Sequence, residues 1–154
     1  MNKFYENLSI EIQELLEKDT DIIANLANVS ACINYYLADI NWVGFYILKE
    51  GQLVLAPFQG KPACTRIAIG DGVCGKAVAD CKIMRIDNVH LFDGHIACDC
   101  DSNSEIVLPI YKNNAPYGVL DIDSPKFARF TQDDEDGLAK IADLISKFLM
   151  GATD

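Results

Sequence analysis

The sequence predicts an α+β domain in which a central, mostly antiparallel β-sheet of about six strands is flanked by helices. Apolar residues recur at helical spacing near both ends of the chain. Between these ends lie short apolar stretches with strand-like patterns, separated by turn residues. Two pairs of these stretches are joined by only a few polar residues, which is typical of hairpins and therefore of antiparallel strand pairs.

Two helices are predicted before the first strand. The apolar positions of the first helix are Phe4, Leu8, Ile12, Leu15 and Leu16. Asp21 is suited to cap a second helix, because its side chain can accept a hydrogen bond from a free backbone N–H. The buried stripe of that helix should hold Ile22, Ile23, Leu26, Ile33 and Leu37.

Six strand-like stretches follow, at 42–48, 53–58, 65–69, 83–86, 105–111 and 117–122. The first two flank KEGQ and the last two flank KNNAP, so each pair should form a hairpin. The intervening GDGVCGKAV predicts a glycine-rich turn that opens a short helix. It lacks the Lys-Ser/Thr ending of a phosphate-binding loop.

The last predicted helix is TQDDEDGLAKIADLISKFL. Thr131 should cap it, and the acidic residues that follow suit the positive end of the helix dipole. Before the second hairpin, residues 88–103 have little regular pattern. Long loops inside compact domains are usually functional or disordered, which makes this segment a candidate for the functional site.

Composition and charge narrow the class of protein. The 154 residues suggest one domain, and half of them are apolar, enough for a core without cross-links. The chain has no run of about 18 apolar residues and no apolar signal core near its start, so we expect a cytoplasmic protein. A net charge of −10 argues against binding to nucleic acid or to anionic membranes.

The loop HIACDCDSNSEIVLP contains Cys98 and Cys100 beside His95. The Cys-x-Cys spacing is a poor match to zinc sites, and no second cysteine pair mirrors it, so we predict no metal. The alternatives are a disulfide or a reactive thiolate, for which a polar loop provides exposure. For an isolated cysteine on a helix, such as Cys32, ordinary packing is favoured.

Acidic and aromatic residues also stand out in the predicted strands. Asp121 and Asp123 alternate, so both should lie on one face of a strand with Ile122 on the other, and Glu105 precedes a buried strand. These acids are either exposed to solvent or line a binding site, where burial and mutual repulsion would raise a pKa. Trp42 and Tyr46 share a strand face and form either core packing or one wall of a site.

Four blocks of the sequence together resemble the free methionine-(R)-sulfoxide reductases, which are single-domain enzymes of the GAF fold. The blocks are NWVGFYIL, APFQGKPACTRIAIGDGVCGKAV, VHLFDGHIACDCDSNSEIVLP and GVLDIDSP followed by RFTQDDEDGL. They cover nearly the whole chain after the first helix and contain unusual strings such as FQGKPAC and GHIACD. The resemblance implies that residues 1–154 form a single GAF-type catalytic domain.

The resemblance also implies roles for particular residues. Cys98 would be the nucleophile, Cys64 the main resolving cysteine and Cys74 a secondary resolving cysteine. The substrate site would consist of Trp42, Tyr46, Glu105, Asp121 and Asp123. From the chemistry of the sulfoxide, whose oxygen leaves poorly until it is protonated, we also expect one of the three acids to donate a proton. The family implies thioredoxin as reductant, a homodimer and no cofactor.

Two other classes of protein share parts of this pattern. GAF domains also bind small ligands as sensory modules, and fold alone does not determine function. Such a sensor is normally attached to an output domain, for which we expect no room in this chain. The clustered cysteines would also suit a thiol redox sensor. Only the enzyme predicts turnover that is selective for one epimer of methionine sulfoxide.

Overall fold

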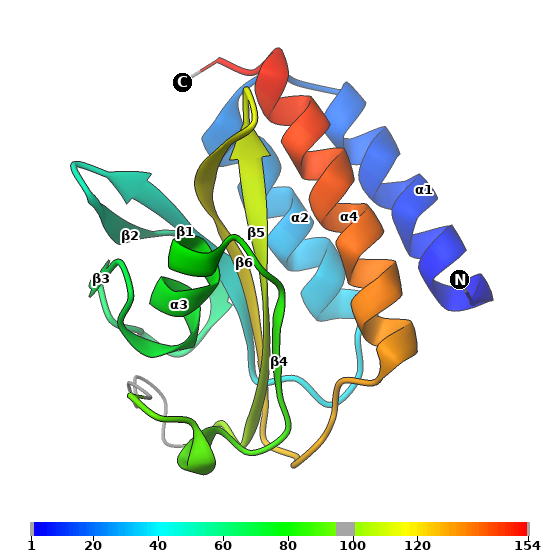
Figure 1. Ribbon diagram of the computed structural model, residues 1–154. Helices are drawn as coiled ribbons and strands as arrows, with labels where there is room; N and C mark the ends of the chain where they lie inside the picture. The colour runs from blue at the N-terminus through cyan, green and yellow to red at the C-terminus, as the bar shows by residue number, and fades with distance from the viewer. Residues whose placement is uncertain (1, 95–100, 154) are drawn as a thin grey trace.

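The computed structural model describes residues 2–94 and 101–153 (Figure 1). The elements follow the predicted order. The helices are α1 (Lys3–Glu17), α2 (Ile22–Tyr36), α3 (Gly72–Asp80) and α4 (Gln132–Met150), with a 3-10 turn, η1 (Val89–Leu91). The strands are β1 (Trp42–Lys49), β2 (Gln52–Gly60), β3 (Arg66–Ala68), β4 (Met84–Ile86), β5 (Ser104–Lys112) and β6 (Ala115–Ser124).

The six strands form one antiparallel sheet in the order β3-β2-β1-β6-β5-β4. Both predicted hairpins, β1–β2 and β5–β6, are confirmed. At the second turn, Asn113 and Asn114 have φ values of 54° and 63°. Asparagine tolerates this left-handed conformation, which matches the turn to the twist of the flanking strands.

The sheet separates two layers of different character (Figure 1). Helices α1, α2 and α4 cover one face and enclose the main apolar core, to which β1, β5 and β6 contribute alternate residues. The other face carries α3 and a smaller apolar cluster that includes Trp42, Tyr46 and Cys74. Because side chains alternate along a strand, the same strands supply both layers.

Hydrogen bonds at the helix ends support two sequence predictions. Asp21 caps α2 by accepting from the Ala24 N–H at 2.8 Å. Thr131 caps α4 in a capping box with Asp134, in which each side chain accepts from the backbone N–H of the other residue.

Two predicted core residues are instead exposed. Phe4 is 41% exposed and Ile23 is 68% exposed. In α1 the buried stripe begins at Tyr5 and continues through Leu8 and Ile12, so Phe4 lies one step around the helix. Apolar character alone does not determine which of two adjacent residues faces the core. Within the described part of the chain, no helix has the length and apolarity needed to span a membrane.

Candidate functional site

A row of acidic residues lies on the sheet face that is opposite the main core. Glu105 on β5 pairs with Asp123 on β6, and Trp42 on β1 pairs with Asp123 from the other side. Asp121 lies two residues before Asp123 on the same face, while Ile122 points into the main core. The predicted alternation of these residues is therefore confirmed.

Two of these acids are removed from solvent. Glu105 is 7% exposed and Asp121 is 5% exposed, so neither is a solvated surface carboxylate, whereas Asp123 is half-buried. Burial raises the pKa of Glu105 well above its usual value, and the charges of Asp121 and Asp123 raise it further. Burial also raises the pKa of Asp121, although hydrogen bonds with Glu105, Cys74 and Asp123 oppose the shift.

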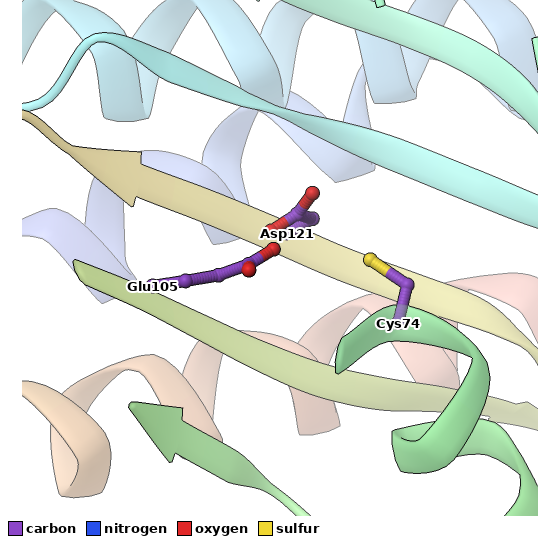
Figure 2. Close-up of side chains that lie close together, drawn as sticks. All are labelled: Cys74, Glu105 and Asp121. Carbon is purple, nitrogen blue, oxygen red and sulfur yellow. The ribbon is translucent and has the colours of Figure 1, made fainter. Parts of the chain in front are cut away.

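Cys74 belongs to this acidic group. It lies near the start of α3, which is anchored by a hydrogen bond from the Gly75 N–H to the Asp71 carbonyl. Its sulfur, a carboxylate oxygen of Glu105 and one of Asp121 all lie within 4.8 Å of one another (Figure 2). Burial raises the pKa of the Cys74 thiol, and the charge of Asp121 adds to this effect. A neutral thiol beside the carboxyls follows from this environment.

An aromatic wall adjoins the acidic row. Trp42 stacks on Phe58 with ring centroids 5.1 Å apart and on Tyr46 at 6.0 Å. Gly44 allows this arrangement, because a Cβ there would lie 2.2 Å from the Cβ of Phe58 on the paired strand. Both Trp42 and Tyr46 are 2% exposed, and β1 places them beside the acids.

The aromatic wall also holds the segment that contains Cys64. The Trp42 indole Nε1–H donates to the Lys61 carbonyl at 3.1 Å, and the Tyr46 hydroxyl donates to the Cys64 carbonyl at 2.8 Å. The Lys61 side chain forms an ion pair with Asp101. Residues 61–64 are thereby attached both to the wall and to the end of the loop that precedes β5.

The six cysteines are in different states. Cys64 is disulfide-bonded, whereas Cys32, Cys74 and Cys81 are free thiols. Burial raises the pKa of Cys32 to about 11, as expected for a thiol packed against a core. The predicted nucleophile Cys98 lies outside the described residues, together with Cys100 and His95.

The arrangement thus brings together five predicted site residues: Trp42, Tyr46, Glu105, Asp121 and Asp123. It adds Cys74 to the acidic group and attaches Cys64 to the wall. Sequence reasoning missed Phe58 and Lys61. The only signal for Phe58 was its position opposite Gly44 in a predicted hairpin, where a residue without a side chain permits close approach. A buried acid pair beside aromatic rings can hold a cationic group and supply a proton.

The chain is similar to known proteins in both sequence and fold. The GAF domain family model matches residues 11–149. A curated relative, the free methionine-R-sulfoxide reductase of Escherichia coli, is 54% identical over 97% of this chain and 92% of its own. The Staphylococcus aureus fRMsr in complex with substrate has a TM-score of 0.90 at 48% identity, covering 94% of this chain and 95% of that one.

A second solved structure contains substrate. The free methionine-R-sulfoxide reductase of Neisseria meningitidis, in complex with its substrate, has a TM-score of 0.94 at 38% identity. The match covers 99% of this chain and 93% of that one. Identity at this level over nearly the full length indicates common ancestry as well as a common fold.

Proposed function

We infer the function from the premise that this chain belongs to the GAF-domain family of free methionine-R-sulfoxide reductases. The chain is accordingly an oxidoreductase that reduces free methionine-(R)-sulfoxide to methionine. The observation that carries the assignment to this site is the buried pair Glu105 and Asp121 beside the Trp42–Tyr46 wall. A zwitterionic amino acid needs such carboxylates for its ammonium group, and an apolar wall suits its S-methyl end.

Catalysis would begin with a thiolate. The Cys98 thiolate attacks the sulfoxide sulfur, the sulfoxide oxygen is protonated, and the oxygen ends on Cys98 as sulfenic acid while methionine leaves. The sulfoxide sulfur gains two electrons and the cysteine sulfur loses two. The aromatic faces of Trp42 and Tyr46 would tolerate the positive charge that develops on the substrate sulfur.

Glu105 is the best-suited proton donor among the three acids. Its raised pKa, caused first by burial and then by the charges of Asp121 and Asp123, favours the protonated form that a donor requires. A donor of this kind accelerates a reaction by roughly 10²–10⁴-fold. Asp121 and Asp123 would then bind the substrate ammonium group.

Cys64 would resolve the sulfenic acid. Its thiol condenses with Cys98 to form a disulfide and release water, and a dithiol reductant such as thioredoxin restores both thiols by exchange. The disulfide-bonded state of Cys64 supports this role. Cys74 is a weaker resolving candidate, because it is 5% exposed and its thiol pKa is raised by burial.

The remaining features concern the whole protein. Residues 1–154 would act as one catalytic domain in the cytoplasm without a cofactor. We also propose a homodimer, supported by apolar side chains that point outward from α1 and α2: Ile10 is 59% exposed and Tyr35 is 80% exposed. Size-exclusion chromatography with light scattering measures this directly, and a monomer at micromolar concentration would contradict it.

The decisive experiment supplies the R and S epimers of free methionine sulfoxide separately. NADPH oxidation is followed with thioredoxin and thioredoxin reductase as the coupling system. We expect turnover with the R epimer only. A parallel reaction with dithiothreitol as reductant is followed by methionine formation. Absence of R-dependent turnover with both reductants would reject the proposed reaction. Turnover with dithiothreitol but not with thioredoxin would reject thioredoxin as partner.

Cysteine variants test the assigned roles. Cys98→Ser should abolish methionine formation, and near wild-type activity would exclude Cys98 as nucleophile. Cys64→Ser should form methionine in a single turnover but fail to cycle with thioredoxin. Cys32→Ser is the matched control, because Cys32 is a buried free thiol in the main core. An unchanged steady-state rate in Cys64→Ser would show that Cys74 or Cys100 resolves the sulfenic acid instead.

A further inference from the structure

The group formed by Cys74, Glu105 and Asp121 has a composition that the proposed reaction does not fully use. One thiol and two carboxylates approach a common centre from α3, β5 and β6 (Figure 2). Their ligand atoms lie within 4.8 Å of one another, and all three residues are buried. Substrate binding and proton donation require the acids, but neither requires a thiol at this position.

An unpartnered oxygen points to a ligand at this centre. Asp121 Oδ1 is buried and receives no hydrogen bond from any residue in the described parts of the chain, although Asp121 is only 5% exposed. A buried carboxylate oxygen without a partner is costly, so such an atom requires explanation. The groups that act on Glu105 and Asp121 are other acids and Cys74. A cation held by these side chains, either a metal ion or the ammonium group of the proposed substrate, would satisfy such an oxygen and offset this concentration of negative charge.

We propose that Cys74, Glu105 and Asp121 form a zinc-binding site. Zinc takes cysteine sulfur at about 2.3 Å and carboxylate oxygen at about 2.0–2.2 Å in tetrahedral geometry. Ligand atoms that already lie within 4.8 Å of one another reach these distances through small side-chain movements. Three protein ligands leave the fourth tetrahedral position for water or another small ligand.

The ligand set selects among metals. Magnesium and calcium require six or more oxygen ligands and do not favour a thiolate. Zinc and cobalt accept a mixture of sulfur and oxygen, and both bind in tetrahedral sites. Binding replaces the Cys74 thiol proton, and any proton on the two carboxyls, with the metal ion.

This site has a consequence for catalysis that rests on the proposed function. Zinc would occupy the two carboxyl groups that bind and protonate methionine sulfoxide. Zinc and substrate therefore exclude each other, and zinc acts as a reversible competitive inhibitor. Direct metal binding does not depend on the reaction, so the two statements are tested separately.

Cobalt provides the direct test. The oxidised protein, in which Cys64 is disulfide-bonded and Cys74 remains a free thiol, is titrated with Co²⁺. We expect a thiolate-to-cobalt charge-transfer band at one metal per chain, displaced by Zn²⁺. The band should disappear in Cys74→Ser and persist in Cys32→Ser, Cys81→Ser and Cys100→Ser. Absence of the band, or its persistence in Cys74→Ser, would overturn the proposal.

A second variant tests the site even if Cys74→Ser fails to fold. Glu105→Gln keeps the thiol and nearly the same shape but loses one anionic ligand. Its zinc affinity is measured by competition with a fluorescent zinc indicator. Loss of a residue that only supports a metal ligand lowers affinity by roughly 10–100-fold, so loss of a ligand should lower it by at least that much. Unchanged affinity in a folded Glu105→Gln variant would exclude Glu105 as ligand and overturn the three-residue site.

Kinetics test the overlap with substrate. The reduced enzyme is used in single turnovers without dithiothreitol. Zinc should raise the substrate concentration needed for the half-maximal rate without lowering the maximal rate. A chelator should reverse this effect. Inhibition that high substrate does not relieve would contradict the overlap. Lack of R-epimer turnover by zinc-free enzyme would instead contradict the proposed function and leave the cobalt result intact.

Discussion

Buried carboxyl groups occur in two regions on opposite faces of the sheet, and their surroundings differ. At the start of α4, Asp134 is surrounded by donors. It accepts from the Tyr5 hydroxyl at 2.6 Å, from the Thr131 N–H at 2.8 Å and from Arg129 Nη1 at 3.0 Å. Glu105 and Asp121 are surrounded by other acids and Cys74, and Asp121 Oδ1 has no donor among the described residues.

The two regions consequently hold their protons differently. Burial alone would raise the pKa of Asp134, but hydrogen bonds from Thr131 and Tyr5 and the charge of Arg129 outweigh it and lower the pKa. At Glu105, burial and the neighbouring acids raise the pKa together. A buried acid with donors stabilises the charged form and ties elements together. A buried acid without them retains a proton, which is useful for catalysis at a cost in stability.

The largest expected effect is on catalysis. Glu105→Gln should lower kcat for the R epimer by roughly 10²–10⁴-fold, because the amide cannot donate the proton. Its free energy of unfolding should not fall, because the neutral amide can still donate a hydrogen bond to Asp121 and never carries a buried charge. Steady-state kinetics and urea denaturation measure the two quantities. Glu50→Gln, at the exposed turn between β1 and β2, is the control and should match wild type in both.

Asp134→Ala should show the opposite behaviour. It removes the cap interaction of α4 and leaves the Tyr5 hydroxyl and Arg129 without their acceptor. Loss of the cap and of an acceptor for a buried donor should together lower the free energy of unfolding by roughly 2–4 kcal/mol. Asp133→Ala, at the exposed neighbouring position, should change stability by less than about 0.5 kcal/mol. A large loss of kcat per folded Asp134→Ala molecule would contradict the separation of the two regions.

The sequence predicted parts of both regions, for a common reason. Strand alternation placed Asp121 and Asp123 on one face, and Thr131 was identified as a cap from its neighbours alone. Local periodicity and capping act over a few residues and can therefore be detected in sequence. Resemblance to known enzymes pointed to residues that the structure places on β1, β5 and β6.

The sequence did not predict the contacts between distant segments. Tyr5 and Asp134 are 129 positions apart, and Phe4 was expected inside the core where Tyr5 lies. Cys74 reaches Asp121 only because α3 packs over β5 and β6. Such pairings depend on how elements pack in three dimensions, which composition and periodicity do not encode.

The opposite pKa directions predict opposite dependences of stability on pH. Glu105 has a raised pKa, so its contribution is fully present below its unfolded value of 4.5 and is lost as pH rises through the folded value. Asp134 has a lowered pKa, so its contribution is present above its unfolded value of 3.8 and is lost as pH falls through the folded value.

Urea titrations at a series of pH values test both dependences. From pH 4.5 upward, wild type should lose stability relative to Glu105→Gln by at most about 1.4 kcal/mol per pH unit. Below pH 4, the stability advantage of wild type over Asp134→Ala should shrink. Parallel curves for wild type and Glu105→Gln above pH 4.5 would show that Glu105 ionises normally in the folded protein and would remove it as proton donor.

The smallest effects come from two matched hydroxyl deletions, one in each region. Tyr5→Phe removes one of several donors to Asp134 and should lower stability by about 1 kcal/mol with kcat unchanged.

Tyr46→Phe keeps the aromatic wall but frees the Cys64 carbonyl. First-turnover methionine formation should be retained, because the ring that is proposed to contact substrate is unchanged. Steady-state cycling should slow about fivefold, the equivalent of about 1 kcal/mol, because Cys64 is less precisely held. Equal slowing of both steps would show instead that the Tyr46 hydroxyl acts on the substrate.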